Sequence, residues 1–304
     1  MNSERVFVPP IKIQGIKTKL VPMIRENVIM NTNSVWIEPF MGSGVVGFNI
    51  EPECAVFADT NPHIIAFYNQ IKDGTITHNS ARFFLESEGK KLEAGGADYY
   101  YTVRERFNRE HDPMDFLFLN RSCFNGMIRF NKNYDYNVPY GHKPQRFSKA
   151  YVTKIVNQIE HVEILLRTHS WSFICQSFEK TIPMAQSNDF IYCDPPYIGR
   201  HVDYYDSWDE DSENRLHDVL VNTEANYMLS TWHHNDYRTN DYIGTIWKDC
   251  FVLTKEHFYY VGAKEENRNT VVEALLTNYS AFPRGKRVSF KDVQLSFDDL
   301  IAVV

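Results

Sequence analysis

The chain has 304 residues, of which 43% are hydrophobic, so it can bury one large core or two smaller ones. Its formal net charge of -7 argues against a protein that coats nucleic acid indiscriminately, because phosphate binding depends on Lys and Arg. The five cysteines form no CxxC pair, which excludes a zinc ribbon or a dithiol redox motif. No apolar stretch approaches the roughly 20 residues of a membrane helix, and the N-terminus lacks a signal-peptide pattern, so we expect a soluble, cytoplasmic protein with reduced thiols.

The first predicted elements are two strand–helix units. Residues 35–40 (VWIEPF) form a short apolar run, and the glycine-containing residues 41–44 (MGSG) separate it from the apolar VVGFNI. This order is typical of a strand, a loop and a helix. A second apolar run ends at Asp59 and is followed by helical spacing from Asn61 onward. Two such units in succession predict a parallel sheet.

The pattern changes between residues 73 and 170, where polar, aromatic-rich stretches with helical spacing replace the short apolar runs. The helical stretches cover 80–93, 98–109 and 148–167. They are interrupted by the Asn- and Gly-rich segment 120–147, which we predict to be a projecting β-hairpin. The region 73–170 is therefore expected to be a mostly helical insertion.

Strand-like runs return after this insertion. They cover 171–176, 189–194, 226–231, 250–258 and 271–278. The last two are separated by polar residues and are expected to form an antiparallel pair. The predicted fold is an α/β, Rossmann-like core made of residues 1–72 and 171–282, followed by a C-terminal tail, 283–304, to which we assign no structure.

The only long basic part of the chain lies in and just after the predicted hairpin. Residues 121–154 contain seven Lys or Arg and a single acid, Asp135, which gives a local net charge of +6. These basic residues alternate with Phe and Tyr, as expected of a loop that faces nucleic acid. From charge alone, an ordinary solvated surface is an equally good interpretation.

The tetrad Asp194-Pro195-Pro196-Tyr197 follows directly after the apolar run FIYC. Ligands of open α/β sheets bind outside the carboxyl ends of the strands, so these residues are expected to face the active crevice. An exocyclic aromatic amine is a poor nucleophile, and the Asp194 carboxylate and the Pro195 carbonyl would localise its lone pair by accepting its two N–H groups. The Tyr197 ring could stack on a base turned out of a duplex. The alternative is a simple turn after a strand.

Three further features are compatible with a nucleotide-like ligand. The glycines of residues 41–44 would let the backbone approach a ligand closely. Asp59 lies where a carboxylate binds ribose hydroxyls, although it could instead be the N-cap of the following helix. Lys17 could place its ammonium against the carboxylate of a methionine-like ligand, whereas most lysines near an N-terminus are simply solvated.

Taken in order, the motifs KIQGIK, EPFMGSG, ADTNPH, FLNRSCFNGMIRFN and CDPPY resemble those of the Dam-type family (alpha group, D12 class) of DNA adenine-N6 methyltransferases. The resemblance extends over nearly the whole chain. It implies a Rossmann-like class I methyltransferase core with an inserted, mostly helical DNA-recognition subdomain that carries a β-hairpin. It also implies S-adenosylmethionine as methyl donor, double-stranded DNA as substrate and a target adenine flipped out of the duplex.

The resemblance assigns roles to individual residues. Asp194, Pro195 and Tyr197 would act on the flipped adenine, with Asp194 also adjoining the cofactor. The implied cofactor-binding residues are Ile13, Lys17, Glu38, Pro39, Phe40 and Asp59. The implied DNA-binding residues are Asn120, Arg121, Asn125 and Arg129, to which we add Lys132 and Lys149 as phosphate contacts. Ile13 and Gln14 stand where the family commonly has Trp-Ala, so an aromatic cofactor contact at this point is not carried over.

Within the family, the runs VPPIKIQGIKTKLVP, CDPPYIGRHVDYY and KEHFYYVGA resemble EcoRV-type modification methylases. This implies GATATC as the recognition site, with its first adenine as target. It also implies either a cognate restriction endonuclease or an orphan methylase, and a monomer in solution. We expect no metal, because the adjacent His233 and His234 lack a supporting ligand set.

Two alternatives stay open at this point. The same acceptor geometry would serve another planar amine, such as cytosine N4 or a glutamine amide of a protein. A catalytically silent DNA-binding regulator that kept the fold is the second alternative, although the intact Asp59, Asp194 and Tyr197 argue against it.

Overall fold

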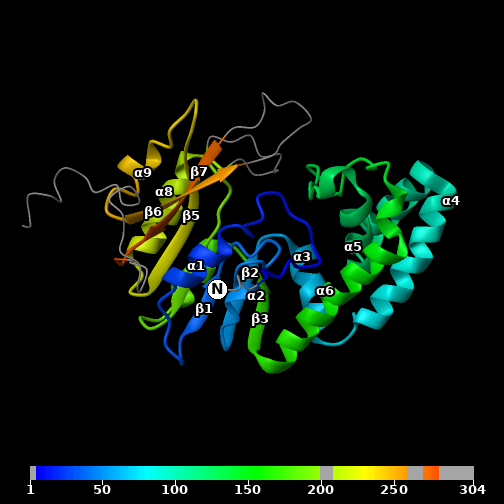
Figure 1. Ribbon diagram of the computed structural model, residues 1–304, viewed down its shortest axis with the longest axis horizontal. Helices are drawn as coiled ribbons and strands as arrows, with labels where there is room; N and C mark the ends of the chain where they lie inside the picture. Colours follow the sequence, from blue (N-terminus) through cyan, green and yellow to red (C-terminus); the bar gives the residue numbers. More distant parts are fainter. Residues whose placement is uncertain (1–4, 199–207, 259–269, 281–304) are drawn as a thin grey trace, which may run out of the picture.

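The computed structural model describes residues 5–198, 208–258 and 270–280 (Figure 1). Its centre is a seven-stranded sheet with the order β3-β2-β1-β4-β5-β7-β6. The strands are β1 (Val35–Glu38), β2 (Cys54–Asp59), β3 (Ser170–Cys175), β4 (Phe190–Cys193), β5 (Asn226–Asn235), β6 (Phe251–Phe258) and β7 (Thr270–Thr277). All seven lie where the apolar runs predict them, and the α/β, Rossmann-like core is confirmed.

The order of the strands predicts where a ligand-binding crevice lies. Strands β3, β2, β1, β4 and β5 are parallel, and β7 pairs antiparallel with both β5 and β6, as predicted for the closing pair. The chain runs outward from β1 in one direction through β2 and β3, and in the other through β4 and β5. Between β1 and β4 the winding therefore reverses, and a crevice is expected there at the carboxyl ends of the strands.

Helices cover both faces of the sheet. They are α1 (Val21–Asn27), α2 (Gly47–Ile50), α3 (Pro62–Lys72), α7 (Phe178–Thr181), α8 (Glu210–Val221) and α9 (Tyr242–Thr245), with a 3-10 turn, η3 (Ile182–Met184). Neighbouring residues of β1 point to opposite faces, as strand geometry requires. Trp36 belongs to the core that includes residues of α1, α2 and α3, whereas Ile37 belongs to the second core with α7 and α8. Both faces are thus apolar, as in other parallel sheets.

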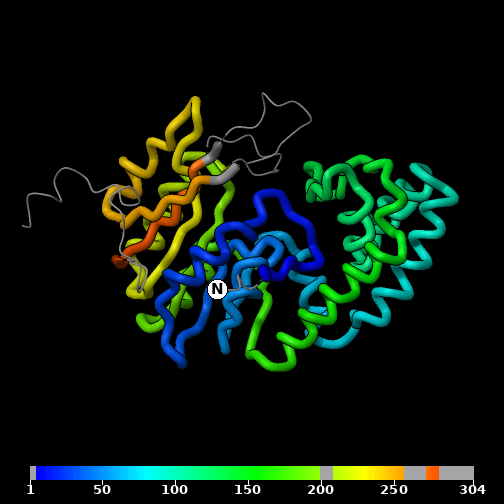
Figure 2. The backbone as a smooth tube through the Cα atoms, in the orientation of Figure 1, coloured from blue at the N-terminus to red at the C-terminus, as the bar shows by residue number. Residues whose placement is uncertain are grey.

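The region between α3 and β3 forms a helical insertion beside the sheet (Figures 1 and 2). It contains α4 (His78–Glu110), α5 (Pro113–Ser122) and α6 (Lys149–Thr168). The predicted helices 80–93 and 98–109 both lie within α4, and a kink at Gly96 (φ 55°, ψ -130°) separates them, so the prediction of two helices is confirmed. Helix α5 was not predicted, because its run FLFL has no helical spacing of polar residues.

The segment 120–147 folds back on itself, as the hairpin prediction requires, but it has little regular strand. Two isolated antiparallel bridges join its arms, Cys123 to Tyr140 and Phe130 to Tyr136. Two 3-10 turns complete it, η1 (Phe124–Gly126) and η2 (Pro144–Phe147). Its residues with positive φ are Asn125, Gly126, Tyr134 and His142. Left-handed residues interrupt an extended ladder, which explains why only isolated bridges form.

The chain leaves the sheet layer when α3 ends at Lys72, and it returns when β3 begins at Ser170. These points lie close to the predicted limits of the insertion, while the division into a catalytic and a recognition part stays a prediction. The predicted C-terminal tail, 283–304, lies outside the described residues. In the three described stretches, no helix combines the length and the apolar character that a membrane span requires.

Candidate active site

The glycine loop (residues 41–44) and Asp59 meet at the carboxyl ends of β1 and β2. The amide of Gly42 donates to Oδ2 of Asp59 at 2.9 Å, and the amide of Asn61 donates to Oδ1 at 2.8 Å. Burial raises the pKa of Asp59, and these amide donors counter the increase. The loop turns at Gly42 (φ +49°) and Gly44 (φ +76°). A Cβ on Gly42 would lie 3.1 Å from Cδ1 of Ile13, so Ile13 covers the loop closely.

The alternative role considered for Asp59, the N-cap of α3, belongs to Asn61. Asn61 caps α3, because its side chain accepts from the amides of His63 and Ile64. Asp59 lies two residues before this cap, and main-chain amides hold both of its carboxylate oxygens. A carboxylate fixed in this way can still accept from hydroxyl groups through its remaining lone pairs.

Glu38 is a buried acid beneath the glycine loop, with 2% of its side chain exposed. Its Oε2 accepts from the indole Nε1 of Trp36 at 2.9 Å and from the amide of Gly47 at 3.0 Å. Burial raises its pKa to about 8, an effect that these two donors oppose and that the charges of Asp194 and Asp59 reinforce. Glu38 is therefore mostly protonated at neutral pH.

Asp194 lies directly after β4 and pairs with Lys17 from the N-terminal stretch. The Nζ of Lys17 is 3.0 Å from Oδ1 of Asp194, and it also donates to the carbonyl of Gly15 at 2.7 Å. Burial raises the pKa of Asp194 to about 6, and Lys17 limits this increase. The carboxylate is thus mostly ionised at pH 7. The structure brings Lys17 to the carboxylate of Asp194, which the sequence did not predict.

Tyr197 completes this group. Its ring lies under the ammonium of Lys17, with 4.6 Å between Nζ and the ring centroid. Its hydroxyl donates to Oε2 of Glu273 in β7 at 3.1 Å. The side chains of Tyr197 and Glu273 are 9% and 2% exposed. Pro195, between Asp194 and Tyr197 in sequence, is also buried.

Aromatic side chains line the face of the site next to the EPF motif. The ring of Phe40 stacks on Phe178, with centroids 5.3 Å apart, and meets Trp208 edge-on at 5.6 Å. Trp208 is held by its indole N–H, which donates to Glu213 at 2.6 Å. Pro39, the middle residue of the motif, is buried. Phe178 and Trp208 were missed in the sequence, where single aromatic residues without a motif carry no functional signal.

The structure places Asn120 and Arg121 in the interior, not at a DNA-accessible surface. Asn120 is 0% exposed, and its side chain exchanges hydrogen bonds of 2.8 and 2.9 Å with the main chain of Lys12. Arg121 is 8% exposed and donates to Gln158 in α6 at 2.7 Å. Both residues are occupied in joining α5 to its neighbours, because every residue of α5 except Met114 is buried. Their predicted contact with DNA would require these bonds to open.

The other predicted DNA-binding residues are more accessible. Asn125, Lys132 and Lys149 are exposed, and Arg129 is half-buried with its Nε donating to Asn137 at 2.8 Å. Lys12 lies near the same segment, and burial together with the charges of Arg121 and Arg146 lowers its pKa to about 8. For these accessible residues, contact with DNA stays a prediction.

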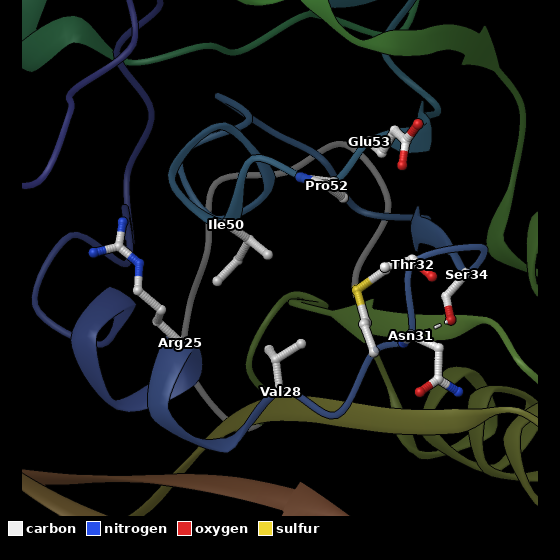
Figure 3. A pocket seen from close by; sticks show the side chains of 9 residues that line it. Arg25, Val28, Asn31, Thr32, Ser34, Ile50, Pro52 and Glu53 are labelled. Atoms are coloured by element: carbon white, nitrogen blue, oxygen red, sulfur yellow. Dashed lines mark hydrogen bonds between the residues drawn. The ribbon is translucent and has the colours of Figure 1, made fainter.

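A separate cavity of about 330 Å³ opens at the opposite edge of the sheet (Figure 3). Ser34 and Glu53, which precede β1 and β2, contribute to its lining together with Arg25. Because it lies at the amino ends of these strands, it is not part of the site around Asp194. The described residues contain no cluster of three His, Cys, Asp or Glu that could hold a metal ion.

The comparison with known proteins agrees with this arrangement. The family model of the D12 class N6 adenine-specific DNA methyltransferases matches residues 14–267. A DNA adenine methylase of Haemophilus influenzae is 35% identical over 196 residues, which cover 62% of this chain and 63% of that protein. The DNA adenine methylase of Escherichia coli strain K12 is 33% identical over 65% of this chain and 66% of its own length. The type II methyltransferase M.MjaIII of Methanocaldococcus jannaschii is 28% identical over 89% of this chain and 99% of its own length.

Proposed function

The chain belongs to the D12 class of N6 adenine-specific DNA methyltransferases, and from this we propose that it transfers a methyl group from S-adenosylmethionine to N6 of an adenine in duplex DNA. The observation that carries the proposal is the cluster of Lys17, Asp194 and Tyr197 at the carboxyl end of β4. This cluster stands beside the glycine loop, where the winding of the sheet reverses.

The residues around the glycine loop suit S-adenosylmethionine. Asp59 would accept from the ribose hydroxyls, because its two oxygens are held in place by main-chain amides. The positive φ of Gly42 and Gly44 lets the backbone approach a ligand where a side chain would intrude. Phe40 contributes an apolar ring surface, and Ile13 covers the loop. Bound S-adenosylmethionine supplies an electrophilic methyl group on a positively charged sulfur.

We propose that Asp194 and the carbonyl of Pro195 accept the two hydrogens of the adenine amine. A carboxylate with a pKa near 6 is available as an acceptor at neutral pH. The new N6–carbon bond forms as the carbon–sulfur bond breaks, and the surplus proton on N6 passes to water. Positioning and hydrogen bonding to the amine supply the rate enhancement, so no separate general base is required.

The flipped adenine would stack on Tyr197, which replaces part of the stacking energy lost when the base leaves the duplex. Asn125 and Arg129 would approach the DNA from the hairpin segment, and Lys132 and Lys149 would contact phosphates. Lys17 contacts Asp194, so we propose that it keeps that carboxylate ionised. It would also bind the methionine end of the cofactor.

We further propose GATATC as the site, with its first adenine as target, on the resemblance of VPPIKIQGIKTKLVP and CDPPYIGRHVDYY to EcoRV-type methylases. The enzyme would then act in the cytoplasm as a monomer, either beside a restriction endonuclease for the same site or as an orphan methylase.

Two measurements test the proposed function. Incubation with duplex DNA and S-adenosylmethionine carrying a labelled methyl group, followed by nucleoside analysis, is expected to give N6-methyladenine. N4-methylcytosine, or label in protein, would instead favour another planar amine as the acceptor. Mapping of methylated bases in DNA from cells that express the chain identifies the site, and modification outside GATATC would overturn that assignment alone.

A further inference from the structure

Two side chains from neighbouring strands hold the segment that follows β4. The hydroxyl of Tyr197 donates to Oε2 of Glu273 in β7 at 3.1 Å. The indole Nε1 of Trp232 in β5 donates to the carbonyl of Ile198 at 3.0 Å. Trp232 and Glu273 are cross-strand partners in the register of β5 and β7. One pair of sheet residues therefore holds two consecutive residues of the 194–198 segment.

The strand pairing beside Trp232 is irregular, and a further hydrogen bond holds β5 at this point. The register of β5 against β7 shifts between Trp232 and His234, and such bulges re-aim side chains next to active sites. The side chain of Asn240 donates to the carbonyl of Trp232 at 2.9 Å, which fixes the strand at this point. Trp232 is 6% exposed and Glu273 is 2% exposed, so neither side chain is free to swing into solvent.

The 194–198 segment needs such support because of its own sequence. Pro195 and Pro196 have no amide hydrogen, so two consecutive residues cannot donate to neighbouring strands. Regular pairing of β4 ends at Cys193, one residue before Asp194. Side-chain hydrogen bonds from β5 and β7 take over where the main-chain pairing stops.

Burial of an acid in the apolar strand β7 also calls for an explanation. The neighbours of Glu273 in the strand, Val272 and Ala274, are apolar, and a buried carboxylate costs free energy unless it is hydrogen-bonded. The bond to Tyr197 provides such a partner. An apolar residue of similar size would fill this position at no such cost, so the acid is better explained by what it positions than by stability.

Resting on the proposed function, we propose that Trp232 and Glu273 form a positioning pair that fixes the 194–198 segment before the target base arrives. Glu273 holds the ring plane of Tyr197, and Trp232 holds the main chain at Ile198. Asp194 and the Pro195 carbonyl are thereby kept at a constant separation from the ring. Preorganisation of this kind acts on the rate of methyl transfer more than on the affinity for DNA.

The first test is a double-mutant cycle between Glu273 and Tyr197. E273L removes the acceptor and Y197F removes the donor, so each is expected to lower kcat at least tenfold with little change in KM for DNA. Together they should lose no more than about twofold beyond the larger single loss, because both remove the same bond. E273Q, whose amide oxygen still accepts, should recover most of the activity. Multiplicative losses in the double variant, or wild-type kcat in E273L, would overturn the inference.

The second test removes the other hydrogen bond and has a matched control. W232F keeps a ring but loses the indole N–H, and it should lower kcat several-fold. The control W171F loses an equivalent indole bond, from Nε1 to the carbonyl of Pro52 at 2.7 Å, at the amino end of β3. It should match W232F in thermal destabilisation while kcat stays unchanged. Equal kcat in the two variants would contradict a positioning role for Trp232.

Hydrogen exchange separates this inference from the proposed function, because it requires no turnover. The amides of Tyr197 and Ile198 should exchange at least tenfold faster in E273L and W232F than in the wild-type protein, and at the wild-type rate in W171F. Unchanged exchange rates in both variants would overturn the inference of a positioning pair, even if the enzyme methylates adenine. A wild-type protein that transfers no methyl group to DNA, yet shows the faster exchange in the variants, refutes the proposed function alone.

Discussion

The ammonium of Lys17 and the carboxylate of Asp194 stand 3.0 Å apart, with side chains that are only 6% and 22% exposed. Burial and, to a smaller extent, the charge of Glu273 raise the pKa of Asp194, whereas this ion pair lowers it, and the resulting pKa is about 6. The proposed acceptor of the adenine amine is thus ionised at neutral pH because a residue 177 positions earlier in the chain approaches it.

Substitution of Lys17 should therefore move the pH profile of methyl transfer. In K17M the pKa of Asp194 is expected to rise above 6, because the carboxylate stays buried while the positive charge of Lys17 is lost. The acid limb of kcat should shift to higher pH, with activity lost near pH 6.5 and partly recovered above pH 8. A K17M profile that parallels the wild-type curve at every pH would contradict this role. K90M, at an exposed position of α4, serves as control.

Asp194→Ala should abolish methyl transfer while specific DNA binding persists, because the side chain acts at the amine and not in the hairpin segment. A loss of roughly 10²- to 10³-fold or more in kcat is expected for an acceptor of this type. The matched control is D189N, at a buried acid whose oxygens accept from the amides of Val35 and Gln186 at the amino end of β4. Normal turnover by D194A would remove the proposed mechanism.

Lys132→Ala and Lys149→Ala should weaken DNA binding without altering sequence preference if these exposed lysines contact phosphates. Each variant is expected to reduce the slope of log affinity against log salt concentration by about 1. Titrations of labelled duplexes at several salt concentrations measure this slope. K248A, on the connection from α9 to β6 across the molecule from α6, should leave it unchanged (Figure 1). A changed sequence preference would identify the lysine as a base-reading residue.

Glu38 should make the protein less stable at alkaline pH. Its pKa rises from 4.5 to about 8 on folding, so the folded state holds the proton more tightly than the unfolded state. The associated stability is fully present below about pH 4.5 and is lost as pH rises through 8, by an amount on the order of a few kcal/mol. Urea unfolding at pH 5 and pH 9 should show a smaller loss in E38Q than in the wild-type protein. An equal loss in both would exclude Glu38 as the cause.

Asn120→Leu should destabilise the fold by roughly 1–3 kcal/mol, because it leaves the half-buried N–H and carbonyl of Lys12 without this partner. Urea midpoints give the change, and N157A, at an exposed position of α6, should be within experimental error of wild type. If Asn120 instead reads DNA directly, the variant would keep its stability and lose binding specificity.

Much of the fold could be predicted because apolar runs and their polar ends are local signals. Asp59 and Asp194 each end an apolar run, and the carboxyl ends of parallel strands meet at one edge, so their proximity followed from the order of elements. The kink in α4 at Gly96 separates the two helices predicted at 80–93 and 98–109, and it was predictable because the adjacent Gly95 and Gly96 lower helix propensity.

Other features of the fold and of the site depend on packing between distant segments, which no local sequence pattern encodes. Arg121 looks like a DNA contact in a basic stretch, yet it is buried because α5 packs against α3 and α4 and its guanidinium donates to Gln158. The contact of Glu273 with Tyr197 joins residues 76 positions apart and depends on the register of β7. One signal was available: a single acid within VVEALL is unusual, because Glu is almost never fully buried unless it has a partner.

The short stretch from Lys12 to Lys17 acts as a tether between the two parts of the molecule. Its first residue is bound through the main chain to Asn120 in α5, and its last through the side chain to Asp194 after β4. Five extended residues span at most roughly 17 Å. The helical insertion cannot move away from β4 beyond that reach unless one of the two anchors releases. The tether therefore limits how far the insertion and the proposed methyl-transfer site can separate.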